Sequence, residues 1–206
     1  MNAPGKILHG FGGYLHDIWK MATCRMLNPH SYVKFLTLDR ARQATGGRTF
    51  IETGTYLGGT AYRCAKVFER VYTIELDTDL ARRAKQNLAG CPNIEVIQGD
   101  ATVELEKVLA SKPVERAVIF LDGHFSGGNT AKGDIEEPAI LELQMLERYR
   151  DRISAIVIDD FRNFGEEPGH PPKWELLRAI DRHFPRADFD VQIQNDQVIV
   201  TRKRAV

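Results

Sequence analysis

The segment 50–60 constrains this chain most, because it reads as a short apolar strand that breaks into a glycine-rich turn and opens a helix. Gly54 lets the backbone turn with a positive φ angle and lie close to a ligand. Gly58 and Gly59 let the start of the helix pack closely on the strand, and Thr60 follows them. The segment predicts the first unit of a nucleotide-binding β-α-β crossover.

The turn differs from the G-x-G-x-x-G fingerprint of dinucleotide-binding sheets. Thr55 and Tyr56 stand where that fingerprint has its second glycine, which disfavours a pyrophosphate bound by bare backbone amides. The acidic Glu52 precedes the turn instead, and a carboxylate there suits a ligand with a positive charge. A nicotinamide-dependent oxidoreductase is therefore the less favoured alternative.

Composition limits the partners. The chain has 206 residues, of which 43% are hydrophobic, enough for one domain with a substantial core. Its 28 basic and 28 acidic side chains cancel, so no overall field favours nucleic acid or an anionic membrane. Three cysteines without metal-ligand spacing indicate a reducing compartment, and the N-terminus lacks a signal-peptide pattern. We expect a cytoplasmic protein with a small-molecule partner.

Apolar runs and helical stripes alternate along the rest of the chain, which is typical of an α/β sheet with crossover helices. The predicted strands after the first are 71–74, 94–97, 117–121 and 155–158, followed by a hairpin of 189–194 and 197–202. The runs 117–121 and 155–158 are apolar on both faces, as central parallel strands should be. We predict a Rossmann-like three-layer sandwich whose mostly parallel seven-stranded sheet ends in an antiparallel hairpin.

The acid-x-Gly-x-x-x-Gly turn from Glu52 to Gly58 and this strand pattern resemble the class I S-adenosylmethionine-dependent methyltransferases. In that family the turn cradles the amino-acid half of the cofactor. The resemblance implies that residues 1–206 form a single methyltransferase domain, with a Rossmann-like core from 48 to 206 and an N-terminal helical cap over 1–45.

Two further strand ends fit a cofactor site. Glu75 follows Glu52 at close to the ~20-residue offset at which an acidic group reaches ribose hydroxyls. Asp100 and Ala101 resemble the family's strand-end pair, in which the acid accepts from the adenine amino group and a small residue lines the ring. Asp100 could equally be the N-cap of the next helix, and Asp77 is expected to cap its own helix.

Three carboxylates mark the next strand ends. Asp122 follows the strand 117–121, and Asp159 and Asp160 follow 155–158. Three anions this close repel one another unless a cation lies among them, and oxygen ligands favour Mg²⁺. The pattern resembles the metal-dependent O-methyltransferases of the catechol and macrolide-sugar types, which implies a divalent metal at Asp122, Asp159 and Asp160. The alternative is that one aspartate positions the cofactor or substrate, the others cap helices, and no metal binds.

His124, two residues after Asp122, is the candidate general base, since its ordinary pKa of about 6.5 suits deprotonation at neutral pH. It could equally be a metal ligand. The catechol-type enzymes have a lysine three residues after the first aspartate, where this chain has Phe125. The glycine-rich segment 123–133 is predicted to be a lid over the substrate.

Before residue 45, amphipathic stripes predict helices that cover the cofactor pocket or form a homodimer surface. We expect no catalytic residue there. The predicted function is metal-assisted O-methylation of a small-molecule or sugar hydroxyl, with His124 and Asp122 as catalytic residues. A non-catalytic cofactor-binding domain is the second alternative, and it would not need three converging acids.

Overall fold

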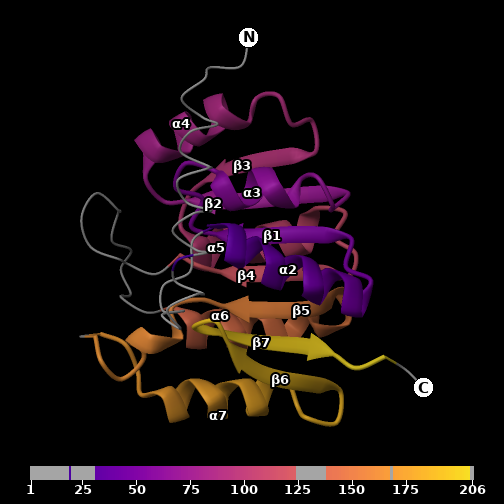
Figure 1. The fold of residues 1–206 in the computed structure, drawn as a ribbon, viewed down its shortest axis with the longest axis vertical. Coiled ribbons are helices and arrows are strands. Elements are labelled where there is room, and N and C mark those ends of the chain that lie inside the picture. The colour runs from indigo at the N-terminus through magenta and orange to yellow at the C-terminus, as the bar shows by residue number, and fades with distance from the viewer. Residues whose placement is uncertain (1–18, 20–30, 124–137, 168, 205–206) are drawn as a thin grey trace.

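A seven-stranded sheet forms the centre of the computed structural model, which describes residue 19 and residues 31–123, 138–167 and 169–204. The strand order is β3-β2-β1-β4-β5-β7-β6, and only β7 runs antiparallel to its neighbours (Figure 1). The strands are β1 Thr49–Thr53, β2 Arg70–Glu75, β3 Ile94–Gln98, β4 Ala117–Leu121, β5 Ile153–Ile158, β6 Phe189–Gln194 and β7 Gln197–Arg202. The predicted fold class and the terminal hairpin are confirmed.

The middle of the sheet is the most apolar part of the molecule. Every residue of β1, β4 and β5 is buried, because helices cover these strands on both faces. The parallel registers pair Thr53 with Ile74 of β2 and with Leu121 of β4, and Leu121 with Ile158 of β5. The carboxyl ends of β1, β2, β4 and β5 therefore lie at one edge of the sheet.

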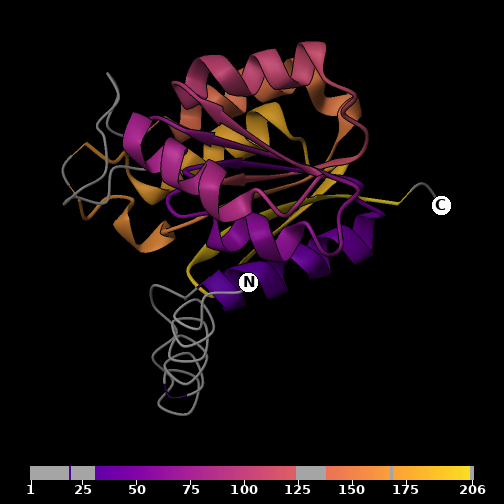
Figure 2. The same cartoon turned by 90° about the horizontal axis from the view of Figure 1, so that it is seen from above.

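Helices form a layer on each face of the sheet, as the view from above shows (Figure 2). On one face lie α2 Ser31–Thr45, α3 Gly59–Cys64 and α4 Thr78–Leu88, whose apolar residues share a core with Phe50 and Phe120. On the other face lie α5 Ala101–Ser111, α6 Ala139–Leu146 and α7 Lys173–His183, which share a core with Ile51 and Ile119. Two 3₁₀ turns, Glu147–Arg152 and Phe161–Asn163, flank β5.

The described part of the predicted N-terminal cap is α2. The sequence places its apolar stripe at Tyr32, Phe35 and Leu36, but these side chains are only half-buried. The buried face is formed by Val33, Leu38 and Ala41 instead. These residues are on the side of α2 that packs against α3 and the sheet. The division of the chain into a cap and a core stays a prediction, since nearly all of residues 1–30 lie outside the described residues.

Among the described helices, none is both long and apolar enough to span a lipid bilayer.

Candidate active site

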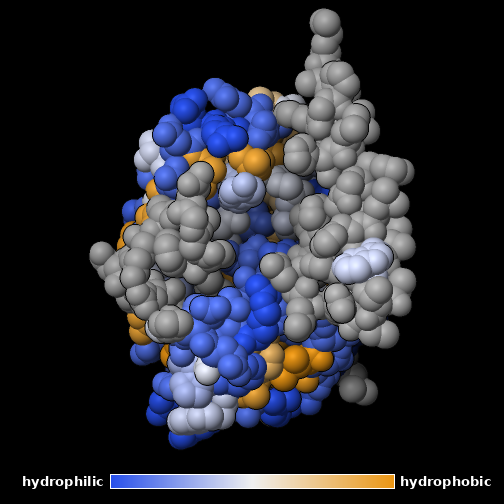
Figure 3. All heavy atoms as spheres, turned by 60° about the vertical axis from the view of Figure 1, so that its left-hand side comes forward, coloured by the Kyte–Doolittle hydropathy of each residue, from blue (hydrophilic) through white to orange (hydrophobic). Residues whose placement is uncertain are grey.

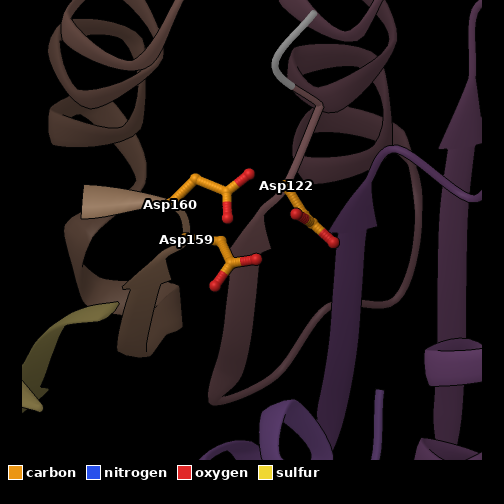
Figure 4. Close-up of side chains that lie close together, drawn as sticks. All are labelled: Asp122, Asp159 and Asp160. Atoms are coloured by element: carbon orange, nitrogen blue, oxygen red, sulfur yellow. The ribbon is translucent and has the colours of Figure 1, made fainter. Parts of the chain in front are cut away.

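Three aspartates meet at the carboxyl edge of the sheet, where ligands of open α/β sheets bind. Asp122 follows β4, and Asp159 and Asp160 follow β5. One carboxylate oxygen from each lies within 4.8 Å of the others, and Figure 4 shows the three side chains gathered in front of these strand ends. The described surface on this side is hollowed and largely hydrophilic (Figure 3). The predicted convergence of the three acids is present in the structure.

The glycine turn after β1 lies directly against the backbone of Asp122. Gly54 has a φ of +85°, and a Cβ atom there would come within 2.5 Å of the Asp122 carbonyl oxygen. Its backbone N–H donates to the Ile74 carbonyl at 2.9 Å. Gly54 is therefore required where the turn crosses the end of β4, which places the turn and the carboxylates side by side.

Gly58 and the residues after it start α3. Gly58 has a φ of +84°, and a Cβ atom there would lie 2.7 Å from the Leu88 side chain of α4. The sequence suggested close packing on the strand, but the neighbour is a helix on the same face of the sheet. Gly59 and Thr60 form the first turn of α3, and Thr60 is buried. Their roles toward a cofactor stay predictions.

Glu52 lies beneath the turn, in a chain of buried hydrogen bonds. Its Oε2 accepts from the Thr73 hydroxyl at 2.8 Å, and the Thr73 and Thr55 hydroxyl oxygens are 2.6 Å apart. Burial raises the pKa of Glu52 to about 8, although the Thr73 hydrogen bond and the charge of Lys34 both act to lower it. Glu52 is therefore largely protonated at neutral pH in the ligand-free protein.

Glu75, at the end of β2, lies beside the same turn. Its carboxylate accepts from the Tyr56 backbone N–H at 2.7 Å and from that of Asp77 at 3.1 Å. These bonds fix the carboxylate while leaving lone pairs for further donors. Tyr56 itself has a φ of 51° and a side chain that is largely exposed. A ribose role for Glu75 fits this geometry and stays a prediction.

Asp100 follows β3 and is the N-cap of α5. Its Oδ1 accepts from the Thr102 backbone N–H at 2.8 Å and from the Thr102 hydroxyl at 2.6 Å. The capping interpretation is thus correct, as it is for Asp77, which accepts from the Leu80 N–H. The other Asp100 oxygen has no bond among the described contacts, so recognition of adenine by Asp100, with Ala101 beside it, stays a prediction.

Lys34 of α2 is a site residue that the sequence analysis missed. Its Nζ donates to Asp122 Oδ1 at 3.0 Å and Oδ2 at 2.9 Å, and it forms an ion pair with Asp159 Oδ2. One signal could have revealed it. Lys34 lies four residues before Leu38 and seven before Ala41, so helical periodicity places a lysine on the buried face, where its charge needs a partner.

The charges in the cluster shift one another's pKa values. Burial alone would lower the pKa of Lys34, but Asp122 and Asp159 outweigh it and raise that pKa. Burial acts to raise the pKa of Asp159, yet the Lys34 ammonium holds it below its ordinary value. Burial, together with the neighbouring Asp159 charge, raises the pKa values of Asp122 and Asp160. The cluster therefore carries one firmly ionised carboxylate and two that take up protons more readily.

The hairpin of β6 and β7 completes the site from the far end of the chain. The Gln197 amide donates to Asp159 Oδ1 at 3.0 Å, in a fully buried contact. Arg162 donates from Nη1 to Asp160 Oδ1 at 2.8 Å and forms an ion pair with Asp196. Arg162 is thus engaged in holding Asp160. Gln197 had no signal in the sequence, because only sheet pairing brings β7 beside β5.

The carboxylates of the cluster are suitable ligands for a divalent metal ion, but the space between them is occupied. Three carboxylates are suitable ligands for a hard cation such as Mg²⁺. The space between the Asp122 and Asp159 carboxylates is occupied, however, by the Lys34 ammonium. A metal ion does not fit this arrangement while Lys34 is in place. His124, the predicted base, and the predicted lid beyond Gly123 lie outside the described residues.

No protein-family model matches the sequence, and no curated protein matches it significantly. Solved structures of methyltransferases, however, share the fold of this chain. An O-methyltransferase from Bacillus cereus in complex with SAH has a TM-score of 0.62 at 16% identity, over 93% of this chain and 91% of that one. A Staphylococcus aureus protein described as a caffeoyl-CoA O-methyltransferase has a TM-score of 0.61 at 15% identity, over 98% of this chain and 93% of that one.

A third similar structure is the O-methyltransferase TomG from Streptomyces achromogenes, in complex with SAM, with a TM-score of 0.55 at 16% identity. The match covers 82% of this chain and 79% of TomG. At such low identities these matches establish the fold. The chain has the class I methyltransferase fold, in agreement with the resemblance of its glycine turn and strand order.

Proposed function

We propose that this protein is an S-adenosylmethionine-dependent methyltransferase that methylates a hydroxyl group of a small molecule or sugar. The observation that supports this most directly is the contact between the glycine turn and the backbone of Asp122, whose side chain belongs to the carboxylate cluster. Gly54 lies so close to Asp122 that no side chain fits between them. A cofactor held by the turn would therefore present its reactive end beside the three aspartates, where an acceptor can be bound.

The chain's own residues would hold the cofactor at the turn and at the ends of β2 and β3. The sulfonium of S-adenosylmethionine, when bound, supplies the methyl group and leaves as the neutral thioether of S-adenosylhomocysteine. Glu75 has free lone pairs for ribose hydroxyls, and Asp100 lies at the next strand end for the adenine. A cationic ammonium group near Glu52 would lower the raised pKa of that carboxyl and draw it into an ion pair.

Methylation of a hydroxyl requires a proton acceptor and an oriented oxygen. The acceptor oxygen forms a bond to the methyl carbon as the carbon–sulfur bond breaks, and the hydroxyl proton passes to a base. Asp122 is suited to receive it, because burial and the Asp159 charge raise the pKa of Asp122. His124, two residues further on, is the second proposed base. Positioning and electrostatics would supply most of the rate enhancement.

The divalent metal ion expected from the sequence is not part of this proposal. It would require the same oxygens of Asp122 and Asp159 that now contact Lys34. Neither base assignment depends on a metal ion.

The two alternative functions have less support. The similar folds named above belong to O-methyltransferases, two of them solved with SAM or SAH, which does not favour a nicotinamide-dependent oxidoreductase. A non-catalytic cofactor-binding domain would not explain why two buried carboxylates and a half-buried one converge here at the cost of desolvation.

Isothermal titration with S-adenosylmethionine and S-adenosylhomocysteine tests the proposal, followed by methyl-transfer assays on a panel of hydroxylated acceptors. We expect micromolar binding that Glu75→Gln weakens about tenfold or more, since two hydroxyl hydrogen bonds to a charged acceptor are worth on the order of 1.5–3 kcal/mol each. Glu166→Gln, a change at an exposed glutamate away from the turn, serves as the matched control. Binding of NAD(H) with no binding of either methionine-derived ligand would contradict the proposal.

A further inference from the structure

The Lys34 ammonium lies among carboxylate oxygens of two aspartates. An ammonium has three N–H donors. In this site its partners are Asp122 Oδ1 and Oδ2, at 3.0 and 2.9 Å, and Asp159 Oδ2. The lysine side chain is only 15% exposed, and the Asp159 side chain is fully buried. Lys34 is thus a built-in cation at the centre of the acidic cluster.

We propose that Lys34 is the resident counter-ion of the cluster formed by Asp122, Asp159 and Asp160, and that it excludes a divalent metal ion from this site. A Mg²⁺ ion bound by these aspartates would need their oxygens at about 2.0–2.1 Å. It would need the space that the ammonium fills, and an ion placed beside the ammonium instead would bring two cations into contact. The two occupants are mutually exclusive.

The architecture of α2 holds Lys34 in this position. Its neighbours Val33, Leu38 and Ala41 are buried against the sheet and α3, so the helix has little freedom to rotate. The ammonium lies 5.6 Å from the centre of the Phe120 ring, where the aromatic face adds a favourable cation–π contact. Withdrawing the lysine would leave Asp159 buried without the one cation that contacts it among the described residues, although its Oδ1 would still accept from the Gln197 amide. Arg162 plays the equivalent part for Asp160 from the opposite side.

One consequence rests on the proposed function. With Lys34 in place, the acceptor hydroxyl would be oriented by the carboxylates that the ammonium holds, and methyl transfer would not respond to chelators. Lys34 acts through Asp122 and Asp159 and is therefore a positioning residue. The exclusion of metal is a property of the folded protein, so it can be tested even if no methyl acceptor is found.

Titration of Mn²⁺ followed by electron paramagnetic resonance of the free ion tests the exclusion directly. The proteins are chelator-treated wild type, Lys34→Met, and Lys34→Met combined with Asp159→Asn. We expect the wild type to bind no Mn²⁺ at this site below millimolar concentration. Lys34→Met, which removes the charge and keeps much of the stem, should bind at least tenfold more tightly. The added Asp159→Asn should abolish that gain.

Two controls separate the charge of Lys34 from a general effect on the fold. Lys34→Arg keeps the cation and should bind as little Mn²⁺ as the wild type. Lys107→Met removes an exposed lysine that pairs with Glu104 at 2.7 Å, and it should change nothing. In thermal unfolding, Mn²⁺ should raise the melting temperature of Lys34→Met but not that of the wild type.

Two results would overturn the proposal. One is a wild-type protein that binds Mn²⁺ at micromolar concentration and loses this binding with Asp159→Asn, because Lys34 would then yield its place to a metal ion. The other is a folded Lys34→Met protein, verified by circular dichroism, with no gain in Mn²⁺ affinity. If Lys34→Met does not fold, Lys34→Gln takes its place. The titration of the wild type with Mn²⁺ tests the exclusion of metal in either case.

Discussion

Two glutamates at the carboxyl edge of the sheet show how burial changes the pKa of a carboxyl group. Glu52 and Glu75 are both strand-end glutamates, but their surroundings differ. Glu75 accepts two backbone N–H bonds, whereas Glu52 accepts one hydroxyl bond in a fully buried place. Burial therefore raises the pKa of Glu52 to about 8. This difference leads to a prediction about stability and pH.

We predict that Glu52→Gln removes a pH dependence from the stability of the protein. Between an unfolded pKa of 4.5 and a folded pKa of about 8, the folded state binds the proton and the unfolded state does not. Stability from this group is thus complete below pH 4.5 and is lost as the pH rises to 8. The free energy of unfolding of the wild type should fall relative to Glu52→Gln by roughly 3 to 4 kcal/mol from pH 5 to 8.

Urea unfolding at several pH values, without added cofactor, measures this difference. Glu166→Gln, which changes an exposed glutamate, should run parallel to the wild type. Equal pH slopes for the wild type and Glu52→Gln would mean that Glu52 is already ionised in the folded protein.

Gly54 offers a second test at the residue scale. Alanine there would adopt a φ of +85° and place its Cβ atom 2.5 Å from the Asp122 carbonyl oxygen. We expect Gly54→Ala to destabilise the protein by roughly 2 kcal/mol or more and to weaken cofactor binding, because the turn must move away from β4. The matched control is Gly90→Ala, since a Cβ atom at Gly90 meets no atom within 4 Å. Similar melting temperatures for the two variants would contradict this account.

At the scale of elements, the helix starts and strand ends could be predicted from the sequence. Whether an aspartate at such a position caps a helix or binds a ligand could not. Asp77 and Asp100 each follow a strand and cap the next helix, at α4 and α5. A capping aspartate and a ligand-binding aspartate look alike in a sequence. Substitutions that separate the cap from the charge can distinguish the two roles.

We predict that Asp100→Ala lowers the free energy of unfolding by about 1 kcal/mol, because it removes the N-cap of α5. Asp100→Asn should leave stability nearly unchanged, since asparagine caps equally well. If Asp100 also accepts from the adenine amino group, Asp100→Asn should still weaken binding of S-adenosylhomocysteine in calorimetry. Normal binding by Asp100→Asn would limit this residue to capping.

At the scale of the whole molecule, the site is assembled from four distant parts of the chain. Lys34 comes from α2, Asp122 from the end of β4, Asp159 and Asp160 from the end of β5, and Gln197 from β7. The antiparallel insertion of β7 between β5 and β6 brings the Asp196 turn to Arg162 and the Gln197 amide to Asp159. The balanced net charge of the chain thus conceals a local concentration of acids that is partly neutralised by two buried or half-buried cations.

The sequence by itself determined the sheet, the place of the glycine turn and the convergence of the three aspartates. These features follow from apolar runs, glycine positions and the rule that parallel strands end at one edge, all of which are local or nearly so. Only the tertiary structure decided which cation meets the aspartates and that Gly58 packs on α4. Those contacts depend on how α2 lies across the sheet and on where Leu88 of α4 meets the start of α3, and such packing between distant segments leaves little trace in the spacing of residues.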